Sequence, residues 1–164
     1  ANQSGGHELR DNGTFKGTIA PKDITPIFTD KIINQIQPTC VFEGFMDFLS
    51  FLSMKEEVTS ACLVLNSVSN TAKAIRYMNA QGISFIRTFL DNDDAGRRAV
   101  QEFAGAGFHV EDMSIHYKDF KDLNEFHVSR VRERQKHKGQ KQAHMSVTDQ
   151  NQNKESKQVK HKIR

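Results

Sequence analysis

Short apolar segments alternate with amphipathic ones along residues 39–127. Three of the apolar segments contain few polar residues, which is typical of parallel strands that are covered on both faces of a sheet. A fourth is more polar and is predicted to lie at a sheet edge. Strands are expected at 39–44, 60–66, 85–90 and 108–115, and helices at 45–54, 71–80, 97–106 and 126–134. This alternation predicts a doubly wound α/β fold with a mostly parallel four-stranded sheet flanked by helices.

The predicted helices carry signals for their buried faces and their ends. Apolar residues of the first helix follow the i, i+3, i+4, i+7 spacing of one buried face: Phe45, Phe48, Leu49 and Leu52. Asn70, or Ser69 before it, is expected to cap the second helix, and Gly82 is expected to end it.

The two ends of the chain differ from this central part. Residues 1–26 are rich in turn residues, and Asn12-Gly13 is a strong signal for a two-residue hairpin turn between strands at 7–10 and 14–19. From Gln135 onward the sequence has little to bury and is predicted to be disordered. The expected organisation is a hairpin remnant of a preceding subdomain (1–26), an α/β domain (39–134) and a disordered basic tail (135–164).

Charge divides the chain in the same way. Residues 1–127 hold 12 Lys and Arg against 17 Asp and Glu, whereas residues 128–164 hold 11 against 3, so the net charge of +3 conceals an acidic domain and a basic tail. Such a tail is either a contact for a nucleic-acid backbone or a solvated extension, and the sequence does not decide between them.

Several classes of protein are disfavoured. No apolar run reaches transmembrane length and no signal-peptide pattern is present, so we expect a cytoplasmic protein without a membrane partner. Cys40 and Cys62 lie in apolar segments without zinc-ligand spacing, which favours buried thiols and no zinc. The first residues, Ala-Asn-Gln, lack a methionine and suggest a processed chain or a piece of a longer one.

Carboxylates follow two of the predicted strands. The strand at 39–42 closes on Glu43-Gly44, and the strand at 85–90 closes on Asp91-Asn92-Asp93-Asp94-Ala95-Gly96. Asp91 and Asp93 would point to the same side of an extended backbone, and two such carboxylates suit Mg²⁺ or Mn²⁺. The alternative is that Asp93 or Asp94 only caps the next helix. If the first and third strands are neighbours, Glu43 and Asp91 flank a topological switch point, where ligands bind.

Three segments in this order carry a family resemblance: Glu43-Gly44 with Asp47, the Asp91–Gly96 segment, and Lys121-Asp122-Leu123-Asn124-Glu125. Together they resemble the Toprim domain, which primases share with topoisomerases, OLD-type nucleases and recombination-repair proteins. The third segment is similar to the primase branch of phages, plasmids and mobile elements. Gly5-Gly6 and Phe15-Lys16-Gly17 resemble the end of the subdomain that precedes Toprim in primases.

The resemblance implies a role for each matching residue. Glu43 would act as general base or acid, or as a metal ligand, and Asp91 and Asp93 would be catalytic ligands of Mg²⁺ or Mn²⁺. Asp47 would assist in metal binding, and Lys121, Asp122 and Asn124 would contact nucleotide or nucleic acid. Simpler interpretations exist for several of them: Asp47 could only complement a helix dipole, Asp122 or Asn124 could be a cap, and Lys121 could be surface charge.

The resemblance also implies a function in DNA replication. The expected activity is DNA primase-type nucleotidyl transfer that makes primers on single-stranded DNA from nucleoside triphosphates, with a helicase or other replication protein as a further partner. A metal-dependent Toprim nuclease and a non-catalytic scaffold that binds metal or DNA remain alternatives. A topoisomerase is disfavoured because it needs a catalytic tyrosine in a separate domain, and only Tyr77 and Tyr117 are present. A receiver domain would carry its acidic pair after the first strand, not the third.

Overall fold

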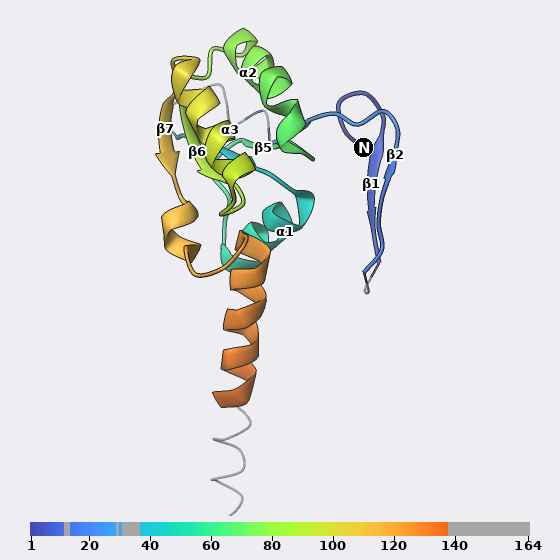
Figure 1. The fold of residues 1–164 in the computed structure, drawn as a ribbon, viewed down its shortest axis with the longest axis vertical. Helices are drawn as coiled ribbons and strands as arrows, with labels where there is room; N and C mark the ends of the chain where they lie inside the picture. Colours follow the sequence, from blue (N-terminus) through green and yellow to red (C-terminus); the bar gives the residue numbers. More distant parts are fainter. Residues whose placement is uncertain (12–13, 29, 31–36, 138–164) are drawn as a thin grey trace, which may run out of the picture. The chain divides into compact units, whose positions relative to one another are not determined.

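The computed structural model describes residues 1–11, 14–28, 30 and 37–137, and residues 1–127 form one compact unit. Its central sheet has five strands in the order β3-β5-β4-β6-β7. Figure 1 shows β6 and β7 side by side in this sheet. The strands are β3 (Thr25–Ile27), β4 (Thr39–Phe42), β5 (Cys62–Val64), β6 (Phe85–Phe89) and β7 (His109–Asp112). Strands β4 to β7 are parallel, which confirms the predicted parallel core with its first and third strands adjacent and its fourth at an edge.

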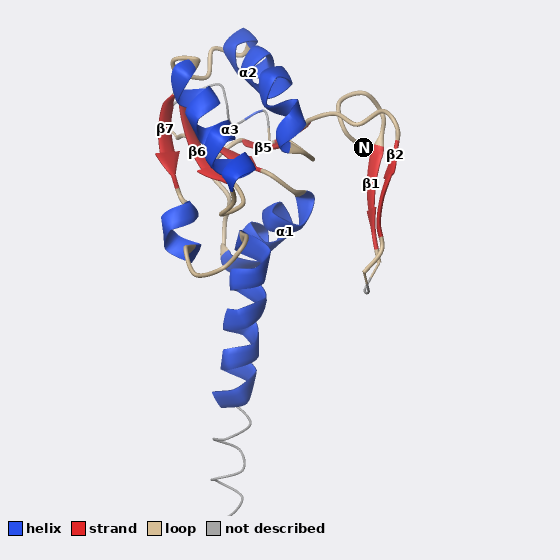
Figure 2. Ribbon diagram, in the orientation of Figure 1, coloured by secondary structure: helices blue, strands red, loops and turns tan. Residues whose placement is uncertain are grey.

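Helices cover both faces of this sheet (Figure 2). They are α1 (Phe45–Met54), α2 (Thr71–Ala80) and α3 (Asp94–Gly105), with 3₁₀ turns η2 (Val68–Asn70) and η3 (Ser114–Tyr117). Side chains of β4 alternate between the two faces. Val41 packs into the cluster that includes α2 and α3, whereas Phe42 packs into the cluster that includes α1 and Tyr117. The predicted α/β fold with helices on the sheet faces is confirmed.

One strand was not predicted. Thr25–Ile27 forms β3, which pairs antiparallel with β5 at the edge of the sheet, so the sheet has five strands instead of four. Pro26 lies within this strand, and a proline is tolerated there because an edge strand needs fewer backbone donors. This strand is short and contains a proline, so it lacks the longer apolar run from which the other strands were predicted.

Several details of the predicted helices differ in the structure. Phe48 is buried as predicted, at 7%, but Leu49, which was assigned to the same face of α1, is 39% exposed, and Phe51, which was not assigned to it, is buried at 7%. Asn70 occupies the N-cap position of α2, but its side chain makes no capping hydrogen bond, and its Nδ2 donates instead to the carbonyl of Leu65 at 2.8 Å. The last helix spans residues 123–137 and begins earlier than the predicted residue 126.

The N-terminal region forms the predicted antiparallel hairpin, from β1 (His7–Arg10) and β2 (Lys16–Ile19). Its turn residues Asn12-Gly13 lie outside the described residues, as do positions 138–164 of the predicted disordered tail. The chain after the hairpin is tied to the sheet by Asn66, whose Nδ2 donates to the carbonyl of Asp23 at 2.7 Å. None of the described helices is both long and apolar enough to cross a membrane.

Candidate active site

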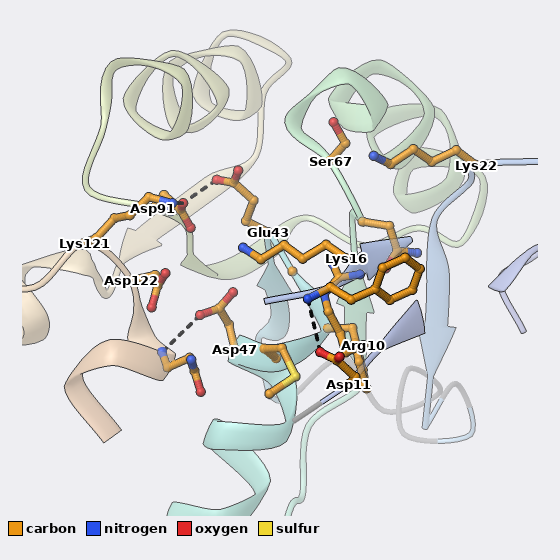
Figure 3. Close-up of a pocket in the computed structure, with 16 residues that line it drawn as sticks. Arg10, Asp11, Lys16, Lys22, Glu43, Asp47, Ser67, Asp91, Lys121 and Asp122 are labelled. Carbon is orange, nitrogen blue, oxygen red and sulfur yellow. Dashed lines mark hydrogen bonds and ion pairs between the residues drawn. The ribbon is translucent and has the colours of Figure 1, made fainter. Parts of the chain in front are cut away.

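The carboxyl ends of β4 and β6 border a cavity of about 430 Å³ (Figure 3). Strand β5 lies on one side of β4 and strand β6 on the other, so the chain reverses its direction across the sheet at this point, and a ligand site is expected there. Two sets of charges line the cavity. We name them the acidic group, Glu43, Asp47, Asp91 and Asp122, and the N-terminal cations, Arg10, Lys16 and Lys22.

Glu43 follows β4 and faces the loop after β6. Its Oε2 accepts a hydrogen bond from the backbone N–H of Asp91 at 3.2 Å, which joins the two central strand ends. Burial raises the pKa of Glu43 to about 7, and the negative charges of Asp91 and Asp93 act in the same direction. A carboxyl group with this pKa can hold or release a proton near neutral pH.

Asp47 lies in the first turn of α1 and is 6% exposed. Its Oδ1 accepts a hydrogen bond from the backbone N–H of Asn124 at 3.1 Å. Burial raises its pKa to about 7, and the charges of Asp122, Asp91 and Glu43 add to this effect. Because burial and neighbouring negative charges disfavour the ionised forms of Glu43 and Asp47, this site would gain from a bound cation.

Asp91 is paired with the ammonium group of Lys121, with 3.1 Å between its Oδ2 and the Lys121 Nζ. The side chain of Asp91 is 12% exposed and that of Lys121 is 62% exposed. Burial raises the pKa of Asp91, whereas Lys121 opposes that shift. In return, Asp91 raises the pKa of Lys121, so the lysine supplies a positive charge to the acidic group.

Asp93 and Asp94 are placed differently from Asp91. Oδ1 of Asp93 accepts hydrogen bonds from the backbone N–H groups of Ala95 and Gly96, both at 2.9 Å, and so caps α3. Asp93 is not among the residues that line the cavity. Asp94 is exposed and pairs with Arg97 on the surface of α3. The hydrogen bonds that the structure shows for Asp93 are therefore those of a helix cap. The role of Asp93 as a metal ligand stays a prediction.

The third motif joins the acidic group to the last helix. Asp122 lines the cavity, and its Oδ1 also accepts the backbone N–H of Glu125 at 2.7 Å, which caps the helix of residues 123–137. Asn124 lines the cavity as well, and its Oδ1 accepts a hydrogen bond from the hydroxyl of Ser50 at 3.1 Å. Both residues thus serve as structural links in addition to lining the site.

Asn92 is a site residue that the sequence did not reveal. Its Nδ2 donates to the carbonyls of Tyr117 and Phe120 at 2.9 and 2.8 Å, and its backbone N–H donates to the carbonyl of Lys121 at 2.7 Å. Asn92 therefore holds the loop that carries Lys121 against the end of β6. Asn92 lies between Asp91 and Asp93 in a segment that was interpreted as a metal-binding motif. Nothing in the sequence indicated that its side chain fixes the loop that carries Lys121.

The N-terminal cations were also missed, because they lie outside the three motifs. Figure 3 shows Lys16 directed across the cavity toward the side of Glu43 and Asp47. Among the described residues, neither Lys16 nor Lys22 forms an ion pair, whereas Arg10 pairs with Glu8 at 3.5 Å. Two lysines without ion-pair partners beside a cavity are suited to bind an anion.

The chemistry of the acidic group fits a hard divalent cation. All of its donors are carboxylate oxygens, as Mg²⁺ and Mn²⁺ prefer. Within the described part of the chain, no three His, Cys, Asp or Glu side chains are already gathered as a metal cage. In phosphate-handling sites Mg²⁺ is usually bound through one or two carboxylates together with water and substrate phosphates.

Comparisons with known proteins agree with this fold. A crystal structure of the primase fragment of the bacteriophage T7 primase-helicase protein is similar, with a TM-score of 0.51 and 22% sequence identity over 76% of this chain and 52% of that one. The chain thus spans about half the length of that fragment. No curated protein gave a significant match. The Toprim-like family matches residues 40–127, which hold the whole acidic group. The chain therefore belongs to the Toprim-like family, as the motifs at Glu43 and Asp91 predicted.

Proposed function

We propose that this chain is the catalytic Toprim domain of a primase-like protein, which makes primers on single-stranded DNA by magnesium-dependent nucleotidyl transfer. One observation carries the proposal: a cavity at the switch point of the sheet has the acidic group on one side and the N-terminal cations on the other. Such a site suits a nucleoside triphosphate, which needs cations at its phosphates and a metal between those phosphates and the protein's carboxylates.

The acidic group supplies the metal-binding side of this site. Asp91 and Asp47 would hold Mg²⁺ or Mn²⁺ with Asp122 near them, and Asp93 would act through its charge or as a further ligand. When bound, the metal would neutralise charge that develops on the transferred phosphoryl group. Lys121 would leave its pair with Asp91 and contact the phosphates, and its exposed side chain leaves it room to do so.

Glu43 would act on the proton of the attacking 3′-hydroxyl group. A carboxylate whose pKa lies near 7 is a better proton acceptor than an ordinary glutamate and is still largely ionised slightly above neutral pH. Asn124 would position Asp47 through its backbone N–H, and Lys16 and Lys22 would orient the triphosphate or the template backbone. A helicase or other replication protein is proposed as a partner by analogy with the primase-helicase alone.

Primer synthesis on a single-stranded template with labelled nucleotides and Mg²⁺ or Mn²⁺ tests this proposal. Glu43→Gln and Asp91→Asn are expected to reduce product at least 100-fold, since each removes a charge from the reacting centre. Asp94→Asn is the matched control, because Asp94 is exposed and lies outside the cavity. Nicking of labelled DNA without primers would point to a nuclease instead, and metal or DNA binding without either product would point to a scaffold.

A further inference from the structure

A second cavity, of about 210 Å³, adjoins the charged one. The two cavities share Phe45 and Asn66 in their linings, so they are neighbours beside the start of α1 and the segment that follows β5. The second cavity is different in chemistry. Its α1 side is apolar, with Phe48 and Leu49, and its other side carries polar residues of the hairpin, among them His7.

The size of the second cavity limits what it can hold. Sites for drug-sized ligands measure roughly 300–1,000 Å³, so a cavity of 210 Å³ suits a fragment such as one heteroaromatic ring system. Aromatic and apolar walls favour a flat ring, and polar groups at the opposite side allow hydrogen bonds with its edge. A nucleobase is a flat ring system with polar atoms at its edge, so it matches this cavity. The neighbouring cavity has the charged side chains that suit the phosphates of the same nucleotide.

We propose that the second cavity binds the base of the nucleoside triphosphate whose phosphates and metal occupy the charged cavity. This inference rests on the proposed function and adds the direction in which the substrate lies, with its phosphates between the acidic group and Lys16 and its base beside Phe45 and Leu49. Phe45 lies at the junction, where the sugar of such a nucleotide would pass from one cavity to the other.

Leu49 provides a direct test. Its side chain is 39% exposed although it lines the cavity, so Leu49→Trp fills the space without disturbing the buried core. Met54→Trp is the matched control: Met54 lies on the same helix, is also 39% exposed, and lines neither cavity. Circular dichroism and thermal unfolding of both variants check that the fold is kept.

Calorimetric titration of the full 164-residue chain with MgATP and with magnesium tripolyphosphate separates the two cavities. The wild type is expected to bind MgATP about tenfold more tightly than tripolyphosphate, since stacking of one base on aromatic side chains has about this effect. Leu49→Trp should remove the preference and leave tripolyphosphate binding within twofold of wild type, whereas Met54→Trp should keep it.

Three results would overturn the inference, and they are distinguishable. Equal affinity of the wild type for both ligands, or a preference that persists in Leu49→Trp, would reject the base site and leave the phosphate site intact. Binding of neither ligand would reject the proposed function and the base site together.

Discussion

Replacement of Asp47 by Asn should stabilise the metal-free protein, and the gain should depend on pH. Asp47 is 6% exposed, and its pKa is raised from 3.8 to about 7, first by burial and then by neighbouring acids. Because the folded state binds the proton more tightly than the unfolded state, this carboxyl group favours folding below its unfolded pKa. That contribution is lost as the pH rises from about 4 to about 7.

The size of the effect follows from the pKa difference. A shift of about three pKa units corresponds to at most about 4 kcal/mol. Part of it belongs to the coupled carboxylates, which readjust when one charge is removed, so we expect about 2 kcal/mol. Asn is similar in size and its Oδ1 can still accept the Asn124 N–H, so no contact is lost to offset the gain.

Urea unfolding in EDTA between pH 4.5 and pH 7.5 measures this difference. The free energy of unfolding of Asp47→Asn should exceed that of the wild type by about 2 kcal/mol at pH 7.5 and by much less at pH 4.5. Asp94→Asn should show no such gain, since its exposed carboxylate is paired with Arg97, which lowers its pKa. A difference that is independent of pH, or a loss of stability at pH 7.5, would refute the argument that the ionised Asp47 carboxylate destabilises the metal-free protein.

Three further substitutions test other parts of the site. Lys121→Met removes the cation beside Asp91, so isothermal titration should show Mg²⁺ affinity raised about threefold or more and tripolyphosphate affinity lowered; unchanged Mg²⁺ binding would contradict the pairing. Gly96→Ala would place a Cβ 2.1 Å from the Asp91 carbonyl oxygen and should cost about 1–3 kcal/mol in urea unfolding, whereas Gly105→Ala, at an open position of the same helix, should stabilise by up to about 1 kcal/mol. Asn92→Ala removes two hydrogen bonds to loop carbonyls and should cost about 2 kcal/mol and weaken metal binding; full stability of that variant would argue against the clamp.

The fold was predictable because most of its parallel strands are apolar and two of them, β4 and β6, are followed by carboxylates. Parallel buried strands leave a clear apolar run, and carboxylates at two strand ends indicated that those strands were neighbours. Leu49 was misplaced because the spacing of α1 allows two overlapping apolar faces, and only the packing of Phe48 and Phe51 against Phe42 and Phe89 selects one. No single-sequence pattern contains that information.

The acidic side of the site was predictable and the basic side was not. Glu43, Asp47 and Asp91 lie in or next to recognisable strand-to-helix connections, so the fold class itself brings them together. Lys16 and Lys22 reach the same cavity from a hairpin about 20 residues or more before Glu43, and their position depends on tertiary contacts such as that between Asn66 and Asp23. Charge composition alone indicated a basic tail instead.

The two sides of the cavity come from different parts of the sequence, so substitutions can change one side and leave the other as it is. The family match begins at residue 40, so the acidic group lies within the shared segment and the N-terminal cations lie before it. Under the proposed function, substitutions in residues 1–22 would therefore alter how the anionic substrate is held without changing the carboxylates of the acidic group. Exchange of residues 1–22 between relatives would be a practical way to transfer substrate preference, since that segment contributes side chains to the cavity but none to the acidic group.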